Sequence, residues 1–431
     1  MVRLGHNMTS ALGTAYEFTA GGGGLVLFAV VGLGLALLLS VTRFDFMVFV
    51  CFCLLGIVRI EPAPVDGLVI VLLLVGLLTG KLSLKALHES SFVHLMLWIF
   101  LVANFASLAA TRTFSDSLRF LMTTVYLIVF AYFVKMYVTS FQAMRRLMVG
   151  YLASAAINTL FIVLGYLGIS PFFELFLQSG VRAVGAFKDP NVFGPFCVPM
   201  ILLLIDEILY PRILPRFFLA KVLGVVALTA AVFLSFSRAA WANLALAVAI
   251  YSLLNVNQVF RIELGNLLTG GTTLLLVTIG GLQVFEPLLG RMGLKEFLAW
   301  RTSSHGYDTY RFDRQKEGIE AGLTHLFGVG PGTWDNAHSL YVRTFAEHGI
   351  LGLASILVLI LVLIMSTFRR ALDEVSKPYG LSAKVILACL VGLALNSVVI
   401  DTIHWRHLWL ILALAWAVCT HPGSDLPDES S

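Results

Sequence analysis

The chain has 431 residues, of which 58% are hydrophobic and only 13% are charged, and its formal net charge is +4. This balance excludes an ordinary soluble globular protein and is typical of a polytopic α-helical membrane protein. The basic residues are dispersed and form no stripe with aromatic residues, so we expect no nucleic-acid partner.

Apolar runs that suit membrane crossings follow one another along most of the chain. They begin near Gly22, Phe44, Val65, Phe92, Ser117, Leu147, Asn191, Leu219, Ala239, Leu267, Ile350, Leu381 and His407. One run is short and the last is interrupted, so we predict about 12 transmembrane helices, or 13. The expected fold class is all-α, with a single polytopic membrane domain over residues 1–421 and a disordered polar tail over residues 422–431.

Basic residues predict the orientation of these crossings. They recur on alternate connections, at Lys81 and Lys85, Arg145 and Arg146, Arg212 with Arg216, Arg261, and Arg369 with Arg370. By the positive-inside rule these connections are cytoplasmic. The opposite face then carries residues 111–116, residues 178–188, the turn at Arg238, a large loop over residues 286–349, and residues 401–406.

The large loop over residues 286–349 is the main interruption of the apolar pattern. Its many ionisable side chains cannot lie in hydrocarbon, so we expect an extracytoplasmic loop that carries short helices. Near its end, Asp335 or Asn336 suits the N-cap of a helix that starts at Ala337. His338 would lie in the first turn, where the helix dipole favours the neutral imidazole that a general base needs. An ordinary polar interfacial histidine is the alternative.

The outward stretch from Arg182 to Asn191 contains a second helix start. Asp189 suits the cap and Pro190 suits the first helical position, which leaves backbone N–H groups facing outward. With Arg182 and Lys188 beside it, this helix start is a candidate cradle for a diphosphate. The carboxylate of Asp189 argues partly against that interpretation, and the alternative is a helix cap with basic interfacial anchors.

Two further polar stretches lie between apolar runs. Arg238 follows Ser235-Phe236-Ser237 at a tight turn, where an arginine needs an anion, a carboxylate or a water-filled cavity unless it reaches the lipid headgroups. Residues 401–407 place His404 and Arg406 among four ionisable groups. This stretch is either a substrate-binding cluster or an internally paired interfacial belt anchored by an aromatic residue.

The sequence lacks common nucleotide and metal motifs. Gly328-Val329-Gly330-Pro331-Gly332 has no Lys-Ser/Thr and no preceding strand, so it predicts a turn rather than a P-loop. There is no Asp-x-Asp pair and no His/Glu helix motif for zinc. The predicted outward face is richer in Arg and His than in clustered carboxylates, so we expect a metal-free anion site and no cofactor.

Taken together, these pieces resemble the O-antigen ligase and O-antigen polymerase superfamily. The motifs are Arg182-x-x-Gly185 followed by Asp189-Pro190-Asn191, then Ser235-Phe236-Ser237-Arg238, then Gly328 to Gly332 followed by Ala337-His338-Ser339-Leu340, and finally Glu347-His348-Gly349-Ile350-Leu351-Gly352. They occur in that family's order within residues 182–353. One departure is Ser339, where the family usually has Asn.

The resemblance implies a metal-independent, inverting membrane glycosyltransferase that uses an undecaprenyl diphosphate-linked glycan as donor. It implies a multi-pass protein of the bacterial inner membrane, with its active site facing the periplasm and with membrane lipids and envelope polysaccharide assembly proteins as further partners. The acceptor is the lipid A core in the ligase branch, and another lipid-linked glycan repeat in the polymerase branch, which includes exopolysaccharide polymerases.

By matching motifs, the resemblance assigns roles to individual residues. His338 is the candidate base for the acceptor hydroxyl, and Arg182 and Arg238 are the candidates that hold the donor diphosphate. Weaker candidates for binding phosphate or sugar are Lys188, Asn191, Arg311, Arg314, His404 and Arg406.

Two other classes of protein fit the composition. A flippase or other carrier of lipid-linked oligosaccharides would place charges at mid-membrane depth and show two similar halves, whereas here the charges gather at one face and no internal repeat is visible. The third class is a non-catalytic scaffold in an envelope assembly complex.

Overall fold

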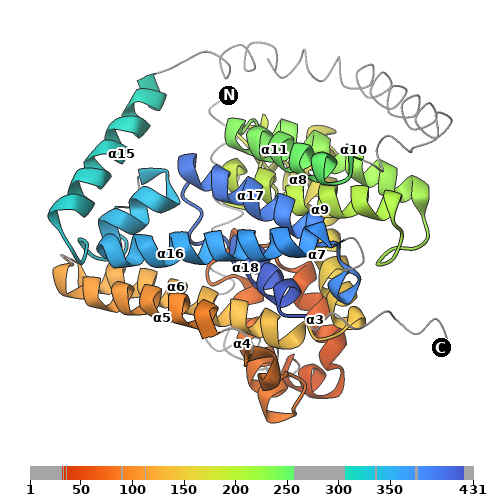
Figure 1. The fold of residues 1–431 in the computed structure, drawn as a ribbon. Coiled ribbons are helices and arrows are strands. Elements are labelled where there is room, and N and C mark those ends of the chain that lie inside the picture. Colours follow the sequence, from red (N-terminus) through yellow and green to blue (C-terminus); the bar gives the residue numbers. More distant parts are fainter. Residues whose placement is uncertain are drawn as a thin grey trace.

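The computed structural model describes residues 32, 34, 36–88, 91–111, 113–256, 306–334, 337–373 and 377–421. In these residues the protein is a bundle of helices with one two-stranded hairpin (Figure 1). The α-helices are α3 (Phe44–Cys53), α4 (Pro64–Leu78), α5 (Ser91–Ser107), α6 (Phe114–Tyr137), α7 (Phe141–Tyr166), α8 (Pro171–Glu174), α9 (Pro190–Leu209), α10 (Phe218–Leu234), α11 (Arg238–Leu254), α15 (Gly306–Thr324), α16 (Leu340–Leu372), α17 (Ala383–Val399) and α18 (Arg406–Cys419). The antiparallel strands are β1 (Leu177–Gln178) and β2 (Arg182–Ala183).

Five of the described helices are long and apolar enough to cross a membrane. They are Ser91–Ala110, Phe114–Tyr137, Phe141–Tyr166, Pro190–Leu209 and Leu340–Leu372. Helices α3, α4, α10, α11, α17 and α18 are apolar but shorter. The prediction of an all-α membrane protein is confirmed. The number of crossings stays a prediction, because most of the run that begins near Gly22 and the run near Leu267 lie outside the described residues. The tail over residues 422–431 lies outside them as well.

The core of the bundle surrounds α18, which lies among the other helices in Figure 1. Almost every side chain of α18 is buried, including the large rings of Trp409 and Trp416. Outer helices instead expose large apolar side chains, such as Leu74 on α4, Trp98 on α5 and Leu361 on α16. An apolar outer surface around an apolar core is the arrangement expected where hydrocarbon, rather than water, surrounds a helix bundle.

Helices α9, α11 and α16 each come directly after one of the sequence motifs, and each begins at a residue whose side chain caps the helix. The Asp189 carboxylate accepts a hydrogen bond from the backbone N–H of Asn191 (2.8 Å) at the start of α9. Ser237 and Ser339 start α11 and α16 in the same way, accepting from backbone N–H groups three residues further on. Asp and Ser are strong N-cap residues, so each motif fixes where its helix begins. The start of α9 at Pro190 agrees with the prediction.

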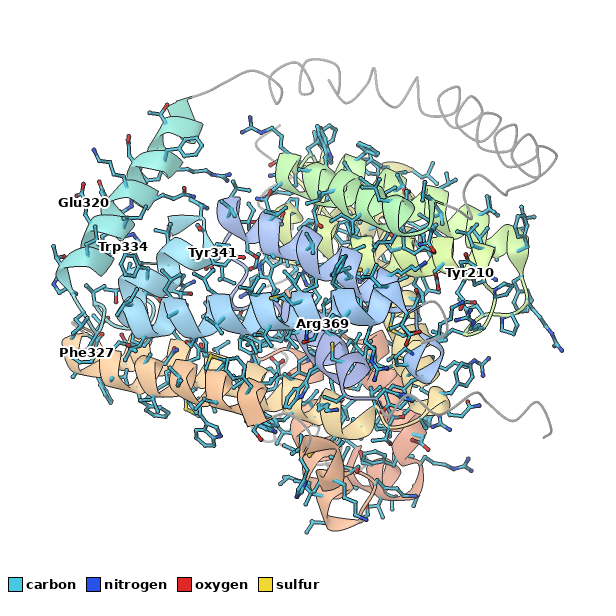
Figure 2. All side chains as sticks on the ribbon, in the orientation of Figure 1. Tyr210, Glu320, Phe327, Trp334, Tyr341 and Arg369 are labelled. Carbon is cyan, nitrogen blue, oxygen red and sulfur yellow. The ribbon has the colours of Figure 1, made fainter. Side chains whose placement is uncertain are left out.

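Four of the connections predicted to be cytoplasmic lie together at one end of the bundle, which we call the basic end (residues 79–83, 137–146, 210–217, 369–373 and 377–382), whereas the predicted connection at Arg261 lies outside the described residues. Here the Arg145 Nε donates a hydrogen bond to the carbonyl oxygen of Ile213 (2.9 Å). The Lys377 ammonium lies 4.3 Å from the centre of the Tyr210 ring. Figure 2 shows Tyr210 and Arg369 well separated from Phe327 and Trp334, which lie toward the other end.

The other end, the site end, gathers residues 56–63, 111, 113–119, 178–189, 235–238 and 400–406. The backbone N–H groups of Val58 and Arg59 donate to the carbonyl oxygen of Ala186 (3.0 and 2.9 Å), and this ties the α3–α4 connection to the stretch that starts α9. Stretches that are far apart in the sequence therefore share one end of the bundle. Which side of a membrane this end faces stays a prediction.

The described part of the large loop contains α15, which packs against the outer part of α16 (Figure 1). Two glycines one helical turn apart permit this close approach. A Cβ atom on Gly318 would lie 2.6 Å from Cγ1 of Val342, and one on Gly322 would lie 2.4 Å from Cδ1 of Phe345. At both distances a larger residue would have to displace the neighbouring side chain, so the two helices meet along a glycine face.

Helix α16 is broken at Gly349, which has a φ of 65°. A Cβ atom there would lie 2.0 Å from the carbonyl oxygen of Leu326, so the position requires glycine for both conformation and space. The break divides α16 into an outer segment, residues 340–348, and an inner segment, residues 350–372. The inner segment begins where the sequence predicted a crossing.

Candidate active site

His338 lies just before α16, in the left-handed backbone region with a φ of 48°. The helix begins at Leu340 rather than Ala337, because Ser339 is the N-cap. The prediction that His338 occupies the first helical turn is therefore wrong. The two residues predicted as caps, Asp335 and Asn336, lie outside the described residues. His338 still lies next to the positive end of a helix dipole.

Neighbouring elements hold the backbone around His338. Gln315 of α15 donates from Nε2 to the carbonyl oxygen of His338 (3.3 Å). The Ser339 hydroxyl is 3.4 Å from the carbonyl oxygen of Ser397, and the Tyr341 hydroxyl donates to the carbonyl oxygen of Ala394 (2.8 Å). Ser339 is the departure from the family pattern, and as an N-cap it does what Asn also does well. The segment is thus fixed against the last turns of α17.

The glycine turn over residues 328–332 is anchored to the outer segment of α16. Gly328, Gly330 and Gly332 all have positive φ, and the predicted turn is confirmed. The N–H of Gly330 donates to the carbonyl oxygen of Glu347 (3.1 Å), and the N–H of Trp334 donates to Oε1 of Glu347 (2.9 Å). A Cβ atom on Gly328 would lie 2.2 Å from the Glu347 oxygen. Glu347 therefore holds the turn that leads to His338.

Arg343 is a buried residue that the sequence analysis did not assign to the site. Its Nε donates to Oε1 of Glu347 (3.0 Å), and it forms an ion pair with Asp401. Its guanidinium also lies 5.0 Å from the centre of the Phe120 ring. The spacing of Arg343 and Glu347, four residues apart at the end of the polar loop, is the signal that could have revealed this pair. The pair joins α16 to the connection that carries His404.

The two arginine motifs meet at the α10–α11 turn. Arg182 on β2 donates from Nε to the carbonyl oxygen of Ser235 (3.0 Å) and from Nη1 to Oε1 of Gln178 (3.3 Å). Arg238 is three residues after Ser235, is exposed, and is the first residue of α11. Arg182 on β2 therefore lies close to the N-terminus of α11, where Arg238 is the first residue.

Helix α17 relates Arg238 to His338. It runs antiparallel to α11, because Asn255 at the end of α11 accepts from Lys384 near the start of α17 (3.1 Å). Further along, Gly392 of α17 is in close contact with Asn243 of α11.

Counting from that contact gives the register at the site end. Arg238 lies five residues before Asn243, and Ser397 lies five residues after Gly392. Because the two helices are antiparallel, both residues lie about 7.5 Å from the Asn243–Gly392 contact in the direction of the site end. Ser397 is the residue whose carbonyl oxygen meets Ser339. Arg238 and the residue after His338 are therefore at the same level of α17, which contacts both α11 and α16 (Figure 1).

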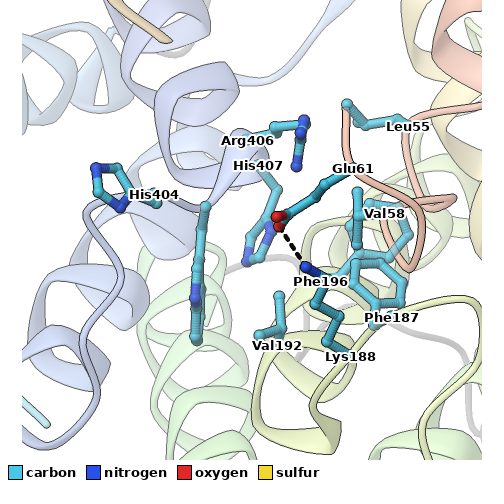
Figure 3. A pocket seen from close by; sticks show the side chains of 11 residues that line it. Leu55, Val58, Glu61, Phe187, Lys188, Val192, Phe196, His404, Arg406 and His407 are labelled. Atoms are coloured by element: carbon cyan, nitrogen blue, oxygen red, sulfur yellow. Dashed lines mark ion pairs between the residues drawn. The ribbon is translucent and has the colours of Figure 1, made fainter. Parts of the chain in front are cut away.

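The weaker candidate Lys188 is paired with a carboxylate (Figure 3). Its Nζ lies 2.6 Å from Oε1 of Glu61, and Arg119 lies 3.2 Å from Oε2 of the same residue. Asn191 is the second residue of α9, and its backbone N–H is used by the Asp189 cap. The pairing of Glu61 with Arg119 had no sequence signal, because the two residues are 58 positions apart in the chain.

Arg406 is also paired, through two parallel hydrogen bonds. Its Nε and Nη2 lie 2.7 and 2.5 Å from the two carboxylate oxygens of Asp66. Arg343 and Asp401 form the second pair near this stretch. Arg406 and Asp401 are thus paired with partners outside residues 401–407, and the choice between the two interpretations of this stretch stays a prediction.

His404 packs within the same cluster. Its ring is stacked on Phe120, with 5.5 Å between the ring centres, and its Nε2 hydrogen-bonds with the Thr124 hydroxyl (3.2 Å). Burial, together with the charges of Arg343 and Arg406, lowers the pKa of His404 to about 3. The imidazole is therefore neutral near pH 7.

The two loop arginines differ in position on α15. Arg314 is paired with Glu317, and its guanidinium lies 4.9 Å from the centre of the Trp334 ring. Arg311 is one turn before Gln315, the residue that contacts the His338 backbone. Residues four apart share a helix face, so Arg311 is on the side of α15 that meets the His338 segment.

Metal ligands do not cluster in the part of the chain that the structure describes: no group of three or more His, Cys, Asp or Glu residues there could hold an ion. The expectation of a metal-free site stays a prediction.

The described residues thus form a polytopic membrane protein whose basic and histidine motifs share one end of the bundle. Residues 223–357 match the family model described as O-Antigen ligase. This range contains Arg238, the glycine turn, His338 and Glu347, and it begins after Arg182. The resemblance to the O-antigen ligase and polymerase superfamily is confirmed over these residues. No curated protein matches the chain.

Proposed function

We propose that this protein is a membrane glycosyltransferase of the O-antigen ligase type. It transfers a glycan from undecaprenyl diphosphate to a hydroxyl of the lipid A core, at the periplasmic face of the bacterial inner membrane. The observation that carries the proposal is the common level of Arg238 and the His338 segment on α17. Arg238, as an anion-binding group, and His338, as a base, would then act at the same end of the bundle. Both residues lie within the range of the family match.

Arg182 and Arg238 are proposed to bind the donor diphosphate. The two hydrogen bonds of Arg182 described above go to neutral oxygens, and they orient its guanidinium. Arg238 adds a second guanidinium at a helix N-terminus, a position that favours anions. Fixed guanidinium groups stabilise the negative charge that develops on the leaving diphosphate, and they do so without a metal.

His338 is proposed to accept the proton of the acceptor hydroxyl. The hydroxyl oxygen attacks the anomeric carbon as the bond to the diphosphate oxygen breaks, which inverts the anomeric centre. His338 takes the hydroxyl proton and must be neutral beforehand, which its place beside the positive end of α16 favours. Its backbone is held by Gln315 and by the Ser339 contact with α17, as a positioned base requires.

The polymerase reaction uses the same chemistry and differs only in its acceptor, a second lipid-linked repeat. A carrier is disfavoured because the ionisable candidates gather at one end of the bundle rather than near its middle.

The decisive experiment uses the purified protein with an undecaprenyl diphosphate-linked glycan, with O-antigen-free lipopolysaccharide as one acceptor and a short lipid-linked repeat as the other. Release of undecaprenyl diphosphate is expected, and the rate should not fall with chelator. A carrier or scaffold would release none. Transfer to lipopolysaccharide indicates a ligase, and chain extension on the repeat indicates a polymerase.

The orientation has its own test. A cysteine in place of Thr324, exposed on α15, should react with an impermeant thiol reagent added from the periplasmic side. A cysteine in place of Arg216, exposed at the basic end, should not react. The reverse pattern would overturn the periplasmic assignment.

A further inference from the structure

A cavity of about 660 Å³ opens at the site end, beside His404 and Arg406. It lies between the start of α4, the first turns of α6 and the connection before α18. Its charged lining residues are Glu61, Asp66, Asp116, Arg119 and Arg406. Its size is within the range of about 300–1,000 Å³ that is usual for small-ligand sites.

We propose that this cavity binds the acceptor saccharide, an inference that rests on the proposed transferase function. The lining holds three carboxylates and two guanidinium groups. Both guanidinium groups are already paired, Arg119 with Glu61 and Arg406 with Asp66. A cavity with this balance repels a diphosphate but offers many donors and acceptors to the hydroxyl groups of a sugar.

Glu61 is the centre of this polar lining. Its carboxylate lies within ion-pair distance of both Arg119 (3.2 Å) and Lys188 (2.6 Å). It also lines a smaller adjoining cavity of about 130 Å³ with Lys188 and His404, shown in Figure 3. Its side chain is 46% exposed, so sugar hydroxyls can reach the oxygens. A planar carboxylate between two cations is well suited to accept two hydroxyl hydrogen bonds in a fixed orientation.

The ring of Phe120 connects the cavity to the segment that carries His338. It lines the cavity and packs against His404 on the one side. It also meets the glycine turn, since a Cβ atom on Gly332 would lie 2.2 Å from Cδ2 of Phe120. Gly332 is six residues before His338. A saccharide in the cavity would therefore lie next to the chain segment that presents the proposed base.

The test measures acceptor and donor kinetics separately with the purified full-length protein. Glu61→Gln removes one charge of the pair while keeping side-chain size, and Arg119→Gln removes the other while keeping a hydrogen-bond donor on a shorter side chain. Each variant should raise the acceptor KM at least tenfold and change the donor KM less than twofold. Arg146→Gln is the matched control, because Arg146 forms a similar exposed ion pair with Asp45 (3.2 Å) at the basic end. It should change neither KM.

The acceptor arms are O-antigen-free lipopolysaccharide and the short lipid-linked repeat, and whichever one saturates the wild-type enzyme identifies the source of the saccharide. An unchanged acceptor KM in both variants, or a rise in the donor KM alone, would overturn the inference and leave the proposed function standing.

Absence of undecaprenyl diphosphate release by the wild type would instead remove the proposed function. Binding then decides the inference, through the change in apparent Tm that each acceptor causes. A rise in Tm in the wild type that is lost in Glu61→Gln supports the saccharide site. An equal rise in both proteins, or no rise with either acceptor, overturns it.

Discussion

The Nε atom of Arg182 donates a hydrogen bond to the carbonyl oxygen of Ser235, 3.0 Å away. This contact joins a strand residue to a turn that lies 53 positions later in the chain. It places the guanidinium of Arg182 close to the helix start of Arg238. The proposed role of the two residues requires a guanidinium group rather than any positive charge, and this requirement can be tested at both positions.

Arg182→Lys and Arg238→Lys should each lower donor turnover at least tenfold, about 1.4 kcal/mol of lost transition-state stabilisation. A lysine keeps the charge but cannot match a diphosphate with two parallel donors. Arg145→Lys is the control, since the Arg145 Nε also donates to a carbonyl oxygen, but at the basic end. Steady-state release of undecaprenyl diphosphate measures the effect. Normal turnover in both site variants would assign these residues to lipid headgroups.

His338→Ala should lower transfer by roughly 10²- to 10⁴-fold, the usual contribution of proton transfer by a positioned base. Donor binding should persist, because it is assigned to the arginines. His338→Gln keeps a hydrogen-bonding side chain but cannot accept the proton, so it should be as inactive as His338→Ala. If glutamine restores most of the activity, His338 only positions substrate, and His404 becomes the next candidate base.

His404 should respond to pH through stability rather than through catalysis. Its pKa in the folded protein, about 3, is below the ordinary value of 6.5, so the unfolded chain binds its proton more readily. The resulting stability is fully present above pH 6.5 and is lost as the pH falls toward 3. Between pH 8 and pH 5 the wild type should therefore lose more apparent Tm than His404→Gln. Equal losses would show that His404 titrates normally.

Gly322→Ala should loosen α15 from α16. The added methyl group overlaps the ring of Phe345, and such overpacking typically costs about 1–3 kcal/mol. Gly67→Ala on α4 is the control, because a Cβ atom there meets nothing within 4 Å. Limited proteolysis should cut the large loop faster in Gly322→Ala alone. Equal protection of both variants would contradict the glycine-face contact.

Much of the architecture follows from the sequence because apolar runs and helix caps are local signals. Asp189 and Pro190 predict the start of α9, and the glycines at 328, 330 and 332 predict a turn. The start of α16 was missed by three residues, since Asp335, Asn336 and Ser339 are all good caps and a sequence pattern does not rank them.

The paired charges could not be predicted for a different reason. Glu61 meets Arg119 across 58 residues and Asp66 meets Arg406 across 340, and such distant partners depend on how the helices pack. Sequence spacing reveals only near neighbours on one helix, such as Arg343 and Glu347. The cavity lining was therefore invisible before the fold was known.

The break at Gly349 has a mechanical consequence. A membrane-spanning helix changes its tilt when bilayer thickness changes, and an unbroken α16 would transmit that tilt to His338. We expect the inner segment to pivot at Gly349, because the helix is broken there and the outer segment is fastened to α15, α17 and the glycine turn. We expect transfer rates to be similar in bilayers of short-chain and long-chain lipids, and a strong dependence on chain length would show that the two segments move as one.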